Sequence, residues 1–126
     1  MLLRKTAVLS VLIAASLFCA YAADITGKWT AQFDTQVGLQ KYTFEFKAEG
    51  TALTGKALAN IAGAESQSTI QDGKINGDEI SFVEMQNYQG QEVRIVYRGK
   101  VSGDEIKFTR KVADQFDEEL VAKRAK

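Results

Sequence analysis

Apolar and polar residues alternate along most of the chain after Asp24. A period of two is the pattern of half-buried β-strands, whose successive side chains point to opposite faces of a sheet. The first alternating segment covers residues 25–33 and has Trp29 at its centre. Further segments cover residues 42–46, 53–61, 66–72, 80–82, 93–101, 106–108 and 119–124, of which 66–72 is the most polar. The pattern therefore predicts about eight strands.

Short turn sequences separate these segments, for example Asn76-Gly77-Asp78 and Ser102-Gly103-Asp104. Glycine supplies the positive φ angle that tight hairpins need, and such short connections cannot carry the crossovers of parallel strands. Residues 73–84 are echoed 26 residues later by residues 99–110. Only two clear copies exist, so we interpret the echo as repeated hairpin geometry within an antiparallel meander.

One apolar face of an eight-stranded sheet has to be covered, and the sequence after residue 24 offers no amphipathic helix to cover it. A sheet that closes on itself buries this face and removes both edges. We therefore expect an all-β, up-and-down barrel of about eight strands. Small inward residues, namely Gly55, Ala57, Ala59 and Gly99, can leave a lumen, whereas the many aromatic residues can fill it.

The first 22 residues have the pattern of a cleavable secretory signal. Arg4 and Lys5 precede an apolar run over residues 7–18, and Ala20-Tyr21-Ala22 matches the small-x-small site of signal peptidase. The apolar run is too short for a membrane-spanning helix. We expect cleavage after Ala22, a single domain over residues 23–126, export to the periplasm or the medium, and no membrane span in the mature chain.

Cys19 is the only cysteine and lies inside this leader. Phe18, directly before it, fits a bacterial lipobox poorly, so we do not expect a lipoprotein. The mature chain then has no disulfide, and its stability rests on the core and the sheet.

The absence of certain residue types limits the catalytic and metal-binding chemistry that this chain can carry out. The chain has no histidine and the predicted mature domain no cysteine, which excludes a Ser-His-Asp triad, thiol catalysis and histidine or thiolate metal sites. Removing Arg4 and Lys5 leaves 14 basic against 16 acidic residues, a net charge of −2. We expect no nucleic-acid partner, no metal and no cofactor.

The residues Thr26-Gly27-Lys28-Trp29 resemble the Gly-x-Trp sequence that opens the first strand of the calycin barrels, the lipocalins and avidins. The resemblance implies that Trp29 closes one end of the barrel beneath an arginine from near the last strand. Arg124 matches that arginine best, with Arg110 as the second choice. Avidins line their biotin site with several tryptophans, and this chain has one. It is more similar to small lipocalin-like domains of exported bacterial proteins, some of which accompany glycan-degrading enzymes.

Glu84 and Arg110 occupy equivalent positions of the internal repeat, on the face that alternation turns inward. Buried charges are costly unless they are paired. Three alternatives remain open: a polar floor of a ligand cavity, a structural ion pair between the two, or a bulge near the barrel end that turns both to water. The last is the commonest arrangement.

Three tyrosines are further candidate ligand residues. Tyr42 and Tyr97 lie on inward positions, where an aromatic ring most often belongs to the core. Tyr88 lies next to the amide-rich turn at residues 86–91, a composition found in carbohydrate sites and in ordinary hairpin tips.

The sequence assigns no catalytic residue. Its first functional hypothesis is a small exported binding barrel for an apolar or sugar-like ligand. The alternative is a structural, accessory or inhibitor-type module with a filled core that binds a protein partner. A carboxylate hydrolase ranks third, because Glu84 is the only inward carboxylate and glycosidases need two.

Overall fold

A computed structural model describes residues 25–125 of the chain. The predicted signal peptide, residues 1–22, and Cys19 lie outside the described residues.

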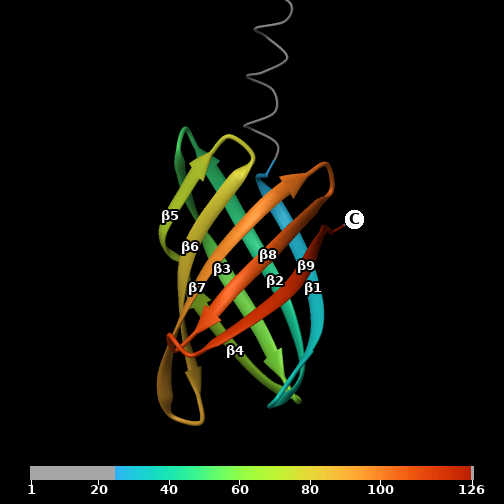
Figure 1. Ribbon diagram of the computed structural model, residues 1–126, viewed down its shortest axis with the longest axis vertical. Helices are drawn as coiled ribbons and strands as arrows, with labels where there is room; N and C mark the ends of the chain where they lie inside the picture. The colour runs from blue at the N-terminus through green and yellow to red at the C-terminus, as the bar shows by residue number, and fades with distance from the viewer. Residues whose placement is uncertain (1–24, 126) are drawn as a thin grey trace, which may run out of the picture.

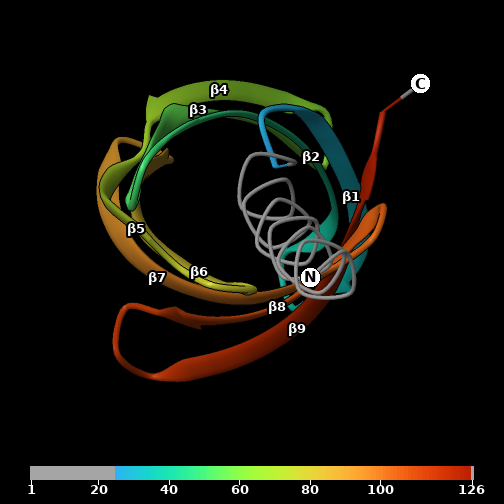
Figure 2. The same ribbon diagram turned by 90° about the horizontal axis from the view of Figure 1, so that it is seen from above.

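The described chain is an antiparallel β-barrel, as the alternation predicts (Figure 1). Its strands are β1 (Gly27–Thr35), β2 (Gly38–Glu49), β3 (Ala52–Ile61), β4 (Ala64–Thr69), β5 (Gln71–Asn76), β6 (Glu79–Tyr88), β7 (Gln91–Ser102), β8 (Glu105–Val112) and β9 (Phe116–Arg124). Eight of them close a ring in the order β1-β2-β3-β5-β6-β7-β8-β9, which Figure 2 shows end on. No part of this described chain forms a helix able to cross a membrane.

The ninth strand arises where the sequence predicts a single strand over residues 66–72. There the chain forms two strands along the same edge of β3: β4 pairs with β3, whereas β5 pairs mainly with β6 and reaches β3 at Lys74. The β5–β6 register shifts between Gln71 and Lys74, and Asp72 in this interval has a φ of 52°. This bulge bends the chain, so that the polar segment pairs first with β3 and then with β6.

The internal repeat corresponds to two equivalent hairpins, β5–β6 and β7–β8. Asn76 pairs with Glu79 and Ser102 with Glu105, so each hairpin has a two-residue Gly-Asp turn. Gly77 and Gly103 have φ angles of 63° and 60°, the left-handed conformation that favours glycine in such turns. The repeat is thus one of hairpin geometry.

Aromatic rings fill most of the barrel axis. Phe82 and Tyr97 stack with their centroids 4.4 Å apart, and Phe44 contacts both edge-on. Gly99 leaves no lumen, because Phe108 occupies the space that a Cβ atom would need, with ring carbons 2.6 and 2.7 Å from that position. The buried aromatic residues are Trp29, Tyr42, Phe44, Phe46, Phe82, Tyr97 and Phe108.

Trp29 and Arg124 lie at the end of the barrel where the described chain begins. They are paired residues of β1 and β9, and the Arg124 guanidinium lies 4.3 Å from the centroid of the Trp29 ring. Trp29 Nε1 donates to the Ile25 carbonyl at 2.9 Å, and Arg124 also donates to Asp104 at 3.2 Å. The arginine thus lies over the tryptophan in the arrangement that the calycin resemblance implies.

Candidate functional site

A connected set of polar side chains lies inside the opposite half of the barrel, towards the end formed by the β1–β2, β6–β7 and β8–β9 turns. Glu84 and Arg110 are each 1% exposed, and Tyr97 is fully buried between them. Pairing of β7 with β6 and β8 is unbroken through these residues. The expected bulge is therefore wrong, since the strands keep their alternation and hold both charges inside.

Tyr97 connects the two charged groups. Its hydroxyl donates to Glu84 Oε1 at 2.7 Å and accepts from Arg110 Nη1 at 2.9 Å. Tyr42 donates to Glu84 Oε2 at 3.1 Å and itself accepts a hydrogen bond from Gln86 Nε2. The structure thus joins four of the five candidate ligand residues, Tyr42, Glu84, Tyr97 and Arg110, in one network.

Arg110 forms its ion pair with Glu118, its cross-strand neighbour on β9. Nε and Nη2 of Arg110 donate to the same carboxylate oxygen at 2.8 and 2.7 Å. Nη2 also donates to Gln40 Oε1 at 3.0 Å, and the guanidinium lies 4.7 Å from the Phe33 ring centroid. The guanidinium is therefore held in a fixed plane by acceptors on three strands.

Burial changes the titration of these groups. It raises the pKa of Glu84 above its ordinary value, although hydrogen bonds from Tyr97 and Tyr42 and the charge of Arg110 oppose the shift. Burial and the neighbouring Glu84 carboxylate also raise the pKa of Tyr42 and Tyr97, so both phenols stay protonated at neutral pH. Both hydroxyls can therefore serve as hydrogen-bond donors towards Glu84.

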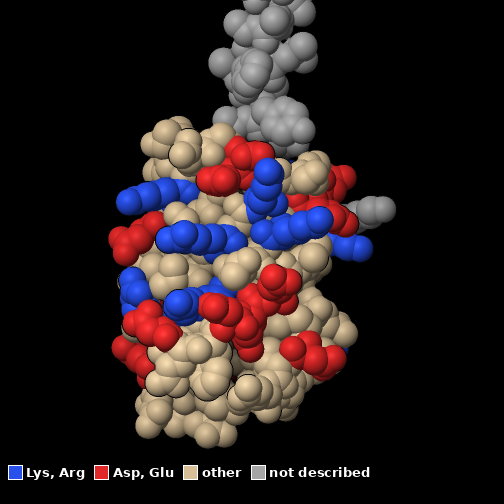
Figure 3. Space-filling view, in the orientation of Figure 1, with Lys and Arg blue, Asp and Glu red and all other residues tan. Residues whose placement is uncertain are grey.

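A pocket of about 330 Å³ opens above this network at the end of the barrel. Gln40, Gln86, Arg110 and Glu118 supply polar groups from the network, and Thr35, Gln36, Gln115 and Asp117 add others. The apolar lining comes from Val37, Val93, Val112 and Phe116, together with Tyr88. Figure 3 shows that the lowest part of the molecule, towards this end, presents no charged side chain on the visible face. The pocket thus has a mostly uncharged mouth and a polar, partly ionic floor.

The candidate residues differ in their access to this pocket. Arg110 and half-buried Tyr88 line it, whereas Glu84 and Tyr97 lie deeper in the barrel. Tyr42 lines another hollow, at the side of the barrel between β1 and β9. Tyr88 lies outside the buried network, and its hydroxyl faces Gln89 at 3.5 Å.

Sequence reasoning missed Gln40, Gln86 and Glu118, and also Ser68 of β4, whose hydroxyl donates to Glu84 Oε2 at 3.5 Å. Their positions carried a usable signal, because Gln40 shares strand parity with Tyr42 and Gln86 shares it with Glu84. Gln86 was included only as part of an amide-rich turn. Glu118 belongs to an acidic run, and its pairing with Arg110 depends on the β8–β9 register.

The described residues contain no cluster of three histidine, cysteine, aspartate or glutamate side chains able to hold a metal ion. The closed barrel is consistent with the calycin architecture. Comparisons of the chain with protein-family models, with curated proteins and with solved structures find no significant match. Function must therefore be argued from the site itself.

Proposed function

We propose that this chain is a small binding barrel that holds a sugar-like or amphipathic small molecule in the pocket at the end of the barrel. The observation that carries the proposal is the fixed polar floor beneath a mostly apolar mouth. Ligand sites commonly combine an apolar lining with a few oriented polar groups, in volumes of roughly 300–1,000 Å³. At about 330 Å³ this pocket accommodates a ligand of monosaccharide size.

The energetics of the floor support the same proposal. A buried ionic network is seldom more stable than apolar residues of the same volume. The rest of the barrel interior is aromatic and aliphatic, so Glu84 and Arg110 depart from a core that otherwise excludes charge. A role in orienting a ligand accounts for retaining them at this one end.

The polar groups indicate which ligand atoms would be recognised. Arg110 and the side-chain amide of Gln86 offer donors, while Glu118 and the Gln40 carbonyl oxygen offer acceptors. Adjacent hydroxyl groups of a sugar both donate and accept, so they suit this mixed floor. The ring of Tyr88 at the mouth provides a face for stacking.

Export and a place among the lipocalin-like domains of bacterial proteins belong to this proposal as well. They rest on the leader pattern of residues 1–22, on the Gly27-Lys28-Trp29 sequence and on the Trp29–Arg124 contact at the barrel end.

Native mass spectrometry of the protein, expressed with its leader and purified under mild conditions, tests the proposal. Val93 lines the pocket, and Val101 is a half-buried valine at the other end of the same strand. Val93→Phe should abolish a small-molecule adduct carried by the wild type, and Val101→Phe should keep it. An adduct that survives Val93→Phe, or a wild type that neither carries an adduct nor binds any member of a monosaccharide and disaccharide panel, contradicts the proposal.

A further inference from the structure

The ring is incompletely paired at the seam between β1 and β9. Pairing across this seam comprises Trp29 with Arg124 and Thr30 with Lys123, and the Ala125 N–H also donates to the Lys28 carbonyl at 2.8 Å. Beyond Thr30, residues 31–35 of β1 pair only with β2 among the described strands, and residues 116–122 of β9 pair only with β8. Both strands therefore present an unpaired backbone edge to the seam.

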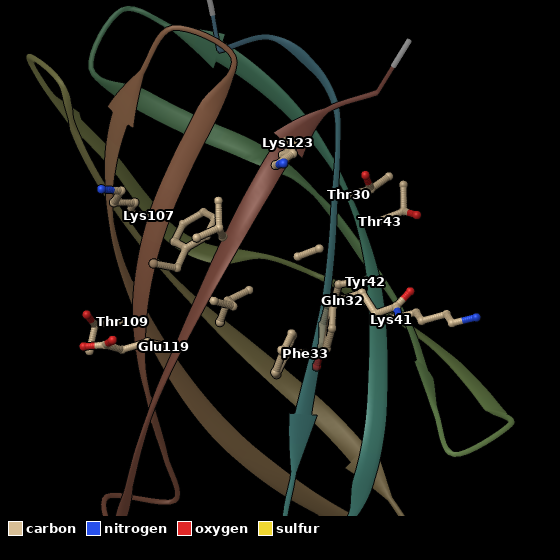
Figure 4. A pocket seen from close by; sticks show the side chains of 14 residues that line it. Thr30, Gln32, Phe33, Lys41, Tyr42, Thr43, Lys107, Thr109, Glu119 and Lys123 are labelled. Carbon is tan, nitrogen blue, oxygen red and sulfur yellow. The ribbon is translucent and has the colours of Figure 1, made fainter.

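A cleft of about 1,060 Å³ follows this seam. Figure 4 shows β1 and β9 diverging along it, with Gln32 and Phe33 on one wall and Thr109 and Glu119 on the other. Between the walls, the floor reaches the barrel core and includes Ala31, Phe108 and Leu120. The cleft is thus an elongated trough with an apolar floor between two open strand edges.

The exposed large hydrophobic residues of the described chain lie on the two hairpins whose strands border the seam, and Val121 also lines the cleft. Val37, Leu39, Phe116 and Val121 are between 37% and 48% exposed. All four belong to the β1–β2 and β8–β9 hairpins that border the seam, with Val37 and Phe116 also lining the end pocket. Long exposed strand edges with apolar side chains are normally protected, because they pair with other chains.

Charge indicates the chemistry of the strand that would fit. Lys41, Lys107 and Lys123 line the cleft, and Glu119 is the only carboxylate residue that lines it with them. Lys41 is on the β2 side and the other two lysines are on the β8 and β9 side. A strand lying in the trough would therefore have cations along both of its margins.

We propose that the β1–β9 seam is a docking site for an extended peptide segment of a partner protein, in which apolar and acidic residues alternate. The peptide adds as a strand to an open edge, so its backbone hydrogen bonds provide affinity. Successive side chains of a strand point to opposite faces. The apolar set covers Phe33, Phe108 and Leu120, and the acidic set reaches Lys41 and Lys107 at the outer surface.

The test uses the mature protein, labelled with ¹⁵N, and a capped heptapeptide of alternating valine and glutamate. Binding should shift the amide signals of residues 31–35 and 117–121 and leave the Gln86 amide unchanged. Lys41→Glu combined with Lys107→Glu should weaken binding by at least about tenfold, because two attractive charge pairs become repulsive. Lys56→Glu, at an exposed position of β3, is the matched control and should change affinity less than about twofold.

Two altered peptides separate strand addition from simple charge attraction. A valine–lysine heptapeptide should bind the wild type at least about tenfold more weakly than the valine–glutamate peptide does. Its affinity should recover on the Lys41→Glu/Lys107→Glu protein. The valine–glutamate peptide with N-methyl groups on alternate residues should lose binding. It keeps its charge, but the backbone N–H donors along one edge of the extended peptide are gone. The proposal is overturned if the N-methylated peptide binds equally well or if shifts fall outside the seam. It is also overturned if the amide shifts of the seam residues change only with protein concentration, because the seam would then be occupied by a second copy of this chain.

Discussion

Tyr97 and Arg110 face each other across β7 and β8, and the Arg110 guanidinium donates to the Tyr97 hydroxyl at 2.9 Å. Because the same hydroxyl donates to Glu84, one phenol group satisfies a buried cation and a buried carboxylate at once. Every buried polar side-chain atom of the described residues has a hydrogen-bond partner. Removing the Tyr97 hydroxyl therefore takes one hydrogen bond from Glu84 and one from Arg110.

Tyr97→Phe should therefore destabilise the protein by about 1–3 kcal/mol, the usual cost of leaving buried polar groups unsatisfied. Urea unfolding followed by the fluorescence of Trp29, the single tryptophan, measures the change. Tyr88→Phe is the matched control, and its half-buried hydroxyl should contribute less than about 0.5 kcal/mol. Equal effects of the two substitutions would show that the bridging hydroxyl carries no stability.

The raised pKa of Glu84 makes stability depend on pH in a defined direction. The folded protein holds the Glu84 proton more tightly than the unfolded chain does, so this group's contribution is complete below its unfolded pKa and is lost as pH rises through its folded pKa. Between those two values the free energy of unfolding should fall by up to about 1.4 kcal/mol per pH unit.

Glu84→Gln isolates this effect, since it removes the titration and retains a hydrogen-bonding side chain. The difference in unfolding free energy, wild type minus Glu84→Gln, should be largest near pH 4 and decline towards neutral pH. Contributions common to the wild type and the variant cancel in the difference. A difference that rises with pH would mean that Arg110 and the phenols outweigh the burial of Glu84.

A substitution at Gly99 tests whether the barrel interior around Phe108 is filled. Gly99→Ala would place a methyl group about where the Phe108 ring lies, and overpacking of this kind costs about 1–3 kcal/mol. In a Phe108→Leu background the same substitution should cost less, because the ring is gone and only the Ile106 Cγ2 methyl remains close, 2.8 Å from the Cβ position. An equal cost in both backgrounds, measured by urea unfolding, would argue against close packing of Gly99 on Phe108.

Arg124 provides a test of barrel closure at the other end. Arg124→Ala removes the cation over Trp29 and should cost about 0.5–2 kcal/mol through the lost cation–π contact and packing. Arg98→Ala, at an exposed position of β7, is the matched control, expected to stay within about 0.5 kcal/mol. A blue or red shift of the Trp29 emission should accompany the first substitution only; unchanged emission would mean that the indole does not sense the arginine.

The strands and the closure of the barrel were predictable because alternation and Gly-Asp turns are local signals. The turns at Gly77 and Gly103 repeat, and this fixed Glu84 and Arg110 as equivalent inward positions. The division of residues 66–72 into two strands was not predictable, since it falls at Ile70, beside a bulge where Asp72 has a positive φ, and aspartate tolerates several conformations.

The site was predictable only in part. Parity places Tyr42, Glu84, Tyr97 and Arg110 inside, but it does not say that their polar groups meet. That depends on cross-strand register, which brings Arg110 next to both Tyr97 and Glu118. The short pairing of β1 with β9 likewise depends on how the ring closes, and no local residue pattern predicts it.

An amide chemical-shift titration tests most directly whether the pocket next to the Arg110 network binds a small ligand. The ¹⁵N-labelled protein is titrated with a panel of monosaccharides, disaccharides and short amphipathic alcohols, beside its Val93→Phe variant. At least one compound should saturably shift the amides of residues that line the pocket, such as Gln40, Gln86 and Tyr88, and Val93→Phe should abolish these shifts. Saturable shifts confined to other surfaces, or no saturable shift with any compound, would contradict ligand binding in this pocket.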